Sequence, residues 1–233
     1  MLNSYARPFL TAVFGASALF TAGCGEATSD DTAQTSQAEA AGDIAKNDVE
    51  GALGEMSIGA VDAPVTVIEY ASVTCPHCAT FHERVYPDIK RDYVDTGKVR
   101  FVFREFPTAP AELSVVGSML ARCAADKGGE EAYFLVLGSL FKTQQKWIYG
   151  GDTRNELMKI AAQAGIDQEG FDACVRRQEL IDLINENVNE GRDKYEINST
   201  PSFVVNGVKR NFSSVEAMSE ALDEAIEKAN AEG

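Results

Sequence analysis

A buried strand that runs into a helix through two cysteines constrains this chain more than any other feature. Residues 65–70 (VTVIEY) are mostly apolar or β-branched, which indicates a strand buried on both faces. After Cys75 the pattern becomes helical, because apolar side chains recur three or four positions apart at Cys78, Phe81, Val85, Ile89 and Tyr93. Residues 99–104 (VRFVFR) return as a strand. We therefore expect a β-α-β unit with parallel strands and a right-handed crossover.

A helical block is predicted to follow this unit. Residues 111 to about 192 show helical periodicity and no strand pattern. Within the block, Thr153 and Glu156 have the spacing of a capping box at the start of a helix.

The C-terminal part predicts a hairpin and one last helix. The Asn206-Gly207 pair lies between two short runs of strand character, which is a strong hairpin signal. Ser213 and Glu216 then have the spacing of a second capping box. The expected fold class is α/β, with a β-α-β half and a β-β-α half on either side of an inserted helical domain.

The Cys75-Pro76-His77-Cys78 motif places two thiols on the first turn of the predicted helix. Unpaired backbone N–H groups and the helix dipole would stabilise a Cys75 thiolate there, and a protonated His77 would add to this. Pro76 costs no hydrogen bond in the first turn. Cys78 belongs to the apolar stripe and should be buried. One reachable sulfur and one buried sulfur suit thiol–disulfide exchange.

Two other uses of the cysteine pair fit the sequence less well. Structural zinc takes four Cys or His ligands, and the only histidines are His77 and His82, so we expect no metal. A purely structural disulfide is the second alternative, but a Cys-x-x-Cys pair at a helix start is strained and exposed for that purpose. Gly128-Gly129 and Gly150-Gly151 are loop signals rather than phosphate cradles, so the redox-active disulfide is the only expected prosthetic feature.

The first 50 residues have the composition of a targeting segment. The uncharged run at 8–23 follows a single arginine, which predicts a signal peptide at 1–23 and export. The run ends in small residues before Cys24 and resembles a bacterial lipobox, although Thr21 stands where Leu or Val is usual. Lipidation of Cys24 is the expectation, and ordinary signal cleavage nearby is the alternative. Residues 24–50 are polar and acidic, and we interpret them as a flexible tether.

The net charge of −15 argues against nucleic acid or an anionic lipid surface as a partner, because both require a basic face. The tether accounts for part of this charge, with seven acidic residues and one lysine, but the domain at 51–233 is acidic as well. The charge excludes these partners without naming another.

Five cysteines are an odd number, so at least one is outside an intramolecular pair, and Cys24 is the candidate. Cys123 and Cys174 lie 51 positions apart on apolar helix stripes. In an exported chain we expect them to form a structural disulfide, worth about 4 kcal/mol on the chain-entropy estimate. Two buried free thiols are the alternative.

Three segments together resemble thiol–disulfide oxidoreductases of the DsbA type, which have a thioredoxin-like fold with a helical insertion. They are residues 62–70 (DAPVTVIEY), the CPHC motif at 75–78, and residues 199–207 (STPSFVVNG). The resemblance covers residues 55 to 230. The Pro-His dipeptide between the cysteines is typical of the oxidising members of the family.

The resemblance implies roles for residues outside the motif. It implies a cis peptide bond at Thr200–Pro201, packed against the active-site sulfurs. It implies that Glu69 is a buried acid that assists proton transfer at Cys78. A strand-end carboxylate turned to water is the alternative for Glu69. Family members often pair this acid with a basic group, for which Arg100 and Arg104 are the candidates.

The implied function is that of an extracytoplasmic, periplasmic dithiol oxidase. A thiolate of a reduced or unfolded exported protein would attack Cys75 of the Cys75–Cys78 disulfide and form a mixed disulfide. A quinone-linked membrane protein would then reoxidise the pair. We expect a monomer, which a lipid on Cys24 could attach to a membrane.

Two alternatives to an oxidase remain. A disulfide isomerase or reductase has the same motif with a different redox poise, although isomerases of this superfamily usually carry an N-terminal dimerisation domain. A membrane-anchored, chaperone-like binding module with a vestigial disulfide is the other. We assign no chemistry to His82 and Trp147 and expect them at helix or surface positions.

Overall fold

The computed structural model describes residues 51–212 and 214–232. The predicted signal peptide, Cys24, the tether and Ser213 lie outside the described residues. The strands are β1 (Met56–Ile58), β2 (Val65–Ala71), β3 (Val99–Glu105), β4 (Ser202–Val205) and β5 (Val208–Arg210). The helical elements are η2 (Gly51–Leu53), α1 (Pro76–Arg84), α2 (Tyr86–Ile89), the π-helical η3 (Lys90–Val94), α3 (Ala111–Lys142), α4 (Gln144–Tyr149), α5 (Thr153–Gln163), α6 (Gln168–Cys174), α7 (Gln178–Tyr195) and α8 (Val215–Glu232).

The strands form one sheet in the order β1-β3-β2-β4-β5. β2 and β3 are parallel, as the predicted β-α-β unit requires, and the other neighbours are antiparallel. β4 and β5 form the predicted hairpin, with positive φ at Asn206 and Gly207. The thioredoxin-like α/β fold is therefore confirmed. β1 was not predicted, because three residues are too few to show a strand period.

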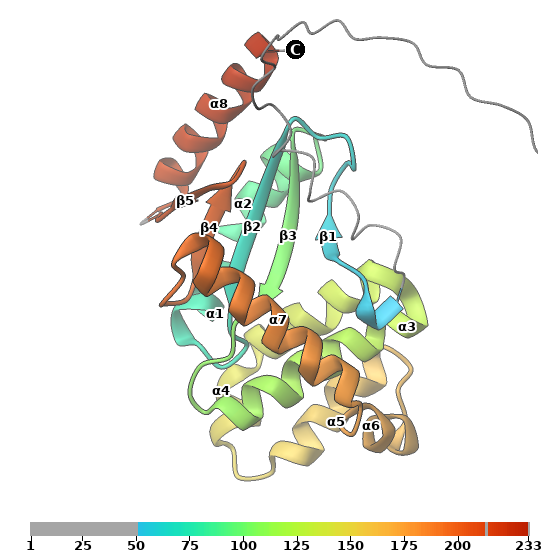
Figure 1. The fold of residues 1–233 in the computed structure, drawn as a ribbon. Coiled ribbons are helices and arrows are strands. Elements are labelled where there is room, and N and C mark those ends of the chain that lie inside the picture. Colours follow the sequence, from blue (N-terminus) through green and yellow to red (C-terminus); the bar gives the residue numbers. More distant parts are fainter. Residues whose placement is uncertain (1–50, 213, 233) are drawn as a thin grey trace, which may run out of the picture. The chain divides into compact units, whose positions relative to one another are not determined.

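Helices cover both faces of the sheet, and Figure 1 shows α7 crossing one of them. Val67 of β2 packs in a cluster with Phe81 of α1 and with apolar residues of α8. Tyr70 points to the opposite face and packs against Tyr195 at the end of α7. Because side chains alternate along a strand, Glu69 shares the face of Val67 and lies beneath α1.

Helices α3 to α7 form the insertion. In Figure 1, α3 to α6 lie beyond one end of the sheet. The insertion extends to Tyr195 rather than to residue 192. α3 is interrupted at Gly128-Gly129, where Gly129 has a φ of 64° that favours glycine. Cys123 of α3 and Cys174 of α6 are joined by a disulfide, as the sequence led us to expect. This bond ties two helices of the insertion together.

One expectation about the helices was wrong, and it concerns the start of α5. The cap of α5 is Asp152, whose side chain accepts a hydrogen bond from the backbone N–H of Asn155 at 3.2 Å. Thr153 is therefore the first helical residue, and Glu156 lies one position too far along for a capping box. Trp147 lies in a helix, α4, as expected; it is fully buried, and its indole N–H donates to the carbonyl of Leu140 at 2.8 Å.

A buried charged network joins the insertion to the sheet. Glu105, the last residue of β3, is fully buried and pairs with Arg122 of α3, whose Nε lies 2.7 Å from a carboxylate oxygen. Tyr133 and Asn187 donate to the same carboxylate at 2.9 and 2.7 Å. Burial acts to raise the pKa of Glu105, but the charge of Arg122 and the hydrogen bonds from Arg122, Tyr133 and the backbone together outweigh it and hold that pKa below its usual value. The network fixes α3 and α7 to the end of β3.

No helix within residues 51–212 and 214–232 combines the length and the apolar character needed to cross a bilayer.

Candidate active site

Cys75 and Cys78 lie at the N-terminal end of α1, and both are free thiols. Cys75 is the N-cap residue with extended backbone angles, and Pro76 occupies the first turn. Cys75 is 7% exposed and Cys78 is fully buried, whereas Pro76 and His77 are exposed. The motif therefore presents one sulfur near the surface and keeps the other inside.

The two thiols differ in acidity because their surroundings differ. A hydrogen bond from Cys78 lowers the pKa of Cys75 to about 5, against the opposing effect of burial. The side chain of Thr200 and the backbone N–H groups of His77 and Cys78 lower this pKa further. Burial raises the pKa of Cys78 far above its usual value, and the hydrogen bond to Cys75 and the negative charge of Glu69 act in the same direction. At neutral pH Cys75 is thus a thiolate and Cys78 a thiol.

The loop before β4 completes the surroundings of Cys75. The Thr200–Pro201 peptide bond is cis. The sulfur of Cys75 lies 3.4 Å from the carbonyl oxygen of Thr200, although 125 positions separate the two residues. The antiparallel pairing of β4 with β2 brings this loop to the start of α1. The sheet therefore brings Thr200 next to Cys75 although the two residues lie far apart in the sequence.

A cavity of about 330 Å³, which we call the front groove, opens beside this loop. One wall comes from α1 and includes His77 and Phe81. The other includes Pro201, Phe203 and Phe212. The front groove offers an apolar surface next to the reactive sulfur.

Glu69 lies beneath α1 and is fully buried, so the alternative of a strand-end carboxylate turned to water is wrong. One of its carboxylate oxygens is 2.8 Å from Nε2 of His82, whose side chain is only 6% exposed. His82 lies in helix α1, as expected, but this contact was not predicted from the sequence. A sequence signal did exist, since His82 follows Cys78 by four residues and shares its helix face.

Neither arginine proposed as the partner of Glu69 is its partner. Arg100 and Arg104 instead form ion pairs with Glu55 at 3.0 and 2.7 Å. Glu55 precedes β1, a strand that the sequence did not predict. The acid beneath the disulfide is thus paired with a histidine instead of an arginine.

Gln144 is a site residue that sequence reasoning missed. It begins α4, is almost fully buried, and its amide nitrogen donates to the carbonyls of Val73 and Cys75 at 2.9 and 3.0 Å. The insertion thereby holds the turn that carries Cys75. A lone glutamine at a helix start gives no sequence signal for such a contact.

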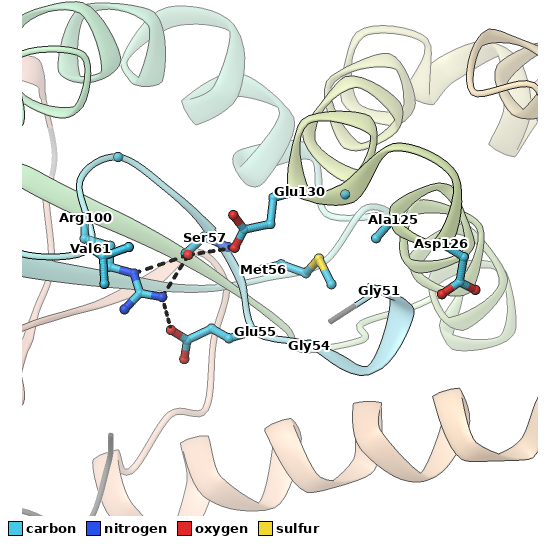
Figure 2. A pocket seen from close by; sticks show the side chains of 12 residues that line it. Gly51, Gly54, Glu55, Met56, Ser57, Val61, Arg100, Ala125, Asp126 and Glu130 are labelled. Atoms are coloured by element: carbon cyan, nitrogen blue, oxygen red, sulfur yellow. Dashed lines mark hydrogen bonds and ion pairs between the residues drawn. The ribbon is translucent and has the colours of Figure 1, made fainter. Parts of the chain in front are cut away.

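A larger cavity, of about 740 Å³, lies beside β1 and is lined by mixed charges (Figure 2). Arg100 reaches the hydroxyl of Ser57 at 3.0 Å, and that hydroxyl contacts Glu130 of α3 at 2.9 Å. These contacts fasten β1 to β3 and α3. Across the part of the chain that the structure describes, no group of three or more His, Cys, Asp or Glu side chains is placed to hold a metal ion.

Comparison with known proteins agrees with this geometry. A family model described as thioredoxin matches residues 52–224. A relative from Rickettsia bellii, named as a protein-disulfide oxidoreductase, is 34% identical over 174 residues, which cover 75% of this chain and 65% of the relative. The chain thus spans slightly less than two thirds of that relative's length. Disulfide bond formation protein D of Bacillus subtilis is 27% identical over 187 residues, with 74% of this chain and 78% of the relative covered.

Among solved structures, alpha-DsbA1 of Wolbachia pipientis superposes with a TM-score of 0.69. The two chains are 29% identical, and the match covers 76% of this chain and 94% of the Wolbachia chain. This chain therefore belongs to the thioredoxin family, as a member of the DsbA type with a helical insertion.

Proposed function

We propose that this protein is a thiol–disulfide oxidoreductase that donates its Cys75–Cys78 disulfide to reduced or unfolded exported proteins. The observation that carries the proposal is the contrast between the two thiols, with the pKa of Cys75 at about 5 and that of buried Cys78 raised. A stabilised thiolate favours the reduced form of the pair, which makes the disulfide form an oxidant.

The size of this effect supports an oxidising direction. At pH 7 the Cys75 thiolate is stabilised by the difference between the pH and its lowered pKa. This difference is about two pKa units, which corresponds to about 2.7 kcal/mol. For a two-electron couple this corresponds to a potential about 60 mV more oxidising. A reductase would gain from the opposite arrangement.

The exchange would proceed through a mixed disulfide. A client thiolate attacks the sulfur of Cys75, the Cys75–Cys78 bond breaks, and Cys78 leaves with the electron pair and takes up a proton. A second client thiolate then attacks the client sulfur of the mixed disulfide, and Cys75 leaves as a thiolate. The client has formed a disulfide and lost two electrons, which reduced Cys75 and Cys78. The apolar front groove beside Pro201, which Thr200 links to the sulfur of Cys75, supports access by an unfolded client.

Export and reoxidation belong to the same proposal. The Cys123–Cys174 disulfide supports an oxidising compartment such as the periplasm, because structural disulfides are rare in reducing ones. The signal-like residues 1–23 and Cys24 support export with a lipid anchor. A quinone-linked membrane oxidase would accept the two electrons from the reduced pair. We propose that the protein acts as a monomer.

The deciding experiment is the equilibrium of Cys75–Cys78 against glutathione, with the fraction of disulfide measured by mass spectrometry. We expect a potential well above roughly −270 mV, the value of thioredoxin. A potential at or below that value would contradict an oxidase and favour the reductase alternative. A Cys78→Ala variant should then accumulate client proteins on Cys75, and a Cys75→Ser variant should accumulate none. Retention of full function by Cys75→Ser would favour a binding module instead.

A further inference from the structure

His82 takes no part in the two exchange steps at Cys75 and Cys78, although it lies close to both the buried acid Glu69 and a second cavity. The side chain of His82 is stacked on Phe141 of α3, with ring centres 4.2 Å apart and an angle of 19° between the rings. The ring of Tyr86 also packs against His82, with ring centres 4.9 Å apart. These contacts fix the imidazole while its Nε2 stays 2.8 Å from Glu69. A histidine held this tightly against a buried acid is placed to pass protons.

A second cavity opens on the outer side of His82. This rear cavity has a volume of about 410 Å³ and is lined by His82, Tyr86 and Phe141, with Lys90 and Lys142 also in its wall. Its lining shares no residue with that of the front groove. The two cavities therefore lie on different sides of the catalytic helix.

The spacing of residues along α1 and into α2 explains why the two cavities lie on different sides of the helix. Ala79, His82, Glu83 and Tyr86 line the rear cavity and follow each other at helical intervals of three or four residues. His77, Thr80, Phe81 and Val85 have the same spacing on another face and line the front groove. One helix thus forms a wall of both spaces, and the buried sulfur of Cys78 lies one turn before His82.

Glu69 supplies the connection between His82 and Cys78. Its negative charge acts on the Cys78 thiol. One carboxylate oxygen contacts His82, and the other has no hydrogen-bond partner among the residues that the structure describes. A buried carboxylate oxygen without a partner is costly, so its retention favours a role in chemistry over one in stability.

We propose that His82 relays the proton of Cys78 between Glu69 and the rear cavity. This inference rests on the proposed thiol–disulfide exchange but not on its direction. While a client occupies the front groove, fully buried Cys78 is closed to solvent on that side. Glu69 and His82 give its proton a separate route. His82 acts through Glu69 and is therefore a positioning residue for the exchange.

The proton balance is simplest for closure of the disulfide. The thiol proton of Cys78 passes to the free oxygen of Glu69, and the thiolate attacks the sulfur of Cys75 and expels the partner thiolate. A turn of the carboxyl group then carries this proton to Nε2 of neutral His82, whose Nδ1 already bears a proton, and restores the Glu69 carboxylate. The imidazolium then releases a proton from Nδ1 to water in the rear cavity, so that one proton leaves for each bond closed. The oxidase direction runs the same steps in reverse and brings one proton to Cys78.

The test follows closure of the disulfide in isolation. Reduced protein is mixed with enough glutathione disulfide that formation of the Cys75–glutathione adduct is not rate-limiting. Acid quenching and mass spectrometry then give the rate at which Cys78 closes the bond and releases glutathione. We expect His82→Gln, which keeps a hydrogen-bonding side chain but cannot carry a proton, to slow closure at pH 7 by about 10- to 100-fold.

A matched control and a rescue separate proton transfer from structure. Lys146→Gln introduces the same side chain at an exposed position of α4 that lines neither cavity, and closure should keep the wild-type rate. His82→Ala should be slow, and added imidazole should restore its closure rate in a concentration-dependent way. If His82→Ala does not fold, His82→Gln carries the test by itself, through its rate and its pH profile between pH 5 and 8.

The pH profile must take account of the other titratable groups around His82. These are Glu69 of β2, Glu83 of α1, Tyr86 of α2, Lys90 of η3 and Lys142 of α3. The profile of the wild-type closure rate should contain a titration step that His82→Gln lacks. A wild-type rate and profile in His82→Gln would overturn the relay, and so would a slow His82→Gln with an unchanged profile. A reducing potential combined with slow closure would overturn the oxidase and leave the relay standing.

Discussion

Two fully buried glutamates on neighbouring strands, Glu69 of β2 and Glu105 of β3, have opposite surroundings. Glu105 is paired with Arg122, and Tyr133 and Asn187 complete its hydrogen bonds. Among the residues that the structure describes, one carboxylate oxygen of Glu69 contacts a histidine and the other has no hydrogen-bond partner. The same side chain at the same depth thus serves to fasten helices in one place and, as we propose, to move protons in the other.

The difference follows from what each partner can do. Arg122 keeps its charge at every accessible pH, so the carboxylate of Glu105 is held ionised and fixed. A histidine partner can gain or lose a proton near neutral pH. A complete network stabilises one arrangement, whereas an incomplete one leaves an acceptor for the proton of Cys78.

The largest expected effect comes from breaking the complete network. Glu105→Gln leaves the buried charge of Arg122 without its counter-charge, and removing one partner of a buried ion pair costs about 3–5 kcal/mol. Urea unfolding of the disulfide form should show this loss as a lower midpoint with an unchanged slope. The closure rate of Cys75–Cys78, measured where the variant is folded, should stay near the wild-type value. A stability within 1 kcal/mol of the wild type would contradict the structural role of Glu105.

Acid should act on the two regions in sequence. The pKa of Cys75 is lowered to about 5, so the stabilisation that its thiolate gives the reduced form is complete above pH 9 and is lost as the pH falls through about 5. Between these values reduction takes up one proton for two electrons, and the potential should rise by about 30 mV for each unit of falling pH. Below pH 5 the slope should approach about 59 mV.

Glu105 provides the contrast in the same titration. Its pKa is lowered by Arg122, so its contribution to stability is present above the usual carboxylate range and is lost only as the pH falls below that range. Unfolding experiments at pH 7 and pH 5 should therefore show little change from this pair. A single slope of 59 mV per pH unit from pH 8 to pH 4 would refute the low pKa of Cys75.

The smallest effect on stability, with a distinct effect on rate, is expected for Glu69→Gln. Among the described residues, only His82 loses a side-chain partner in this variant. The free energy of unfolding should therefore change by less than about 1 kcal/mol. Closure of Cys75–Cys78 should slow by about 10- to 100-fold, because the proton acceptor next to Cys78 is gone. Glu105→Gln is the same substitution at the same burial. If Glu69→Gln instead lost the stability and Glu105→Gln slowed closure, the two glutamates would not have the different roles proposed for them.

The local parts of the fold were predictable from the chain. The β2-to-α1 junction, the hairpin at Asn206-Gly207 and the break at Gly128-Gly129 each have a signal within a few residues, in a period change or a turn pair. β1 had no such signal, because its three residues obtain their conformation from pairing with β3. The cap of α5 was misassigned by one residue, since Asp152 competes with Thr153 for the same role.

The site divides in the same way. The sequence by itself determined the CPHC motif, its place at a helix start and the strongest influence on the pKa of Cys75, because the hydrogen bond from Cys78 comes from within the motif. Only the tertiary structure decided the partner of Glu69, since His82 meets it after α1 packs on β2, and likewise the contact from Gln144 to Cys75. Such contacts arise between residues far apart in the chain, and their geometry depends on how the helices settle against the sheet rather than on any local pattern.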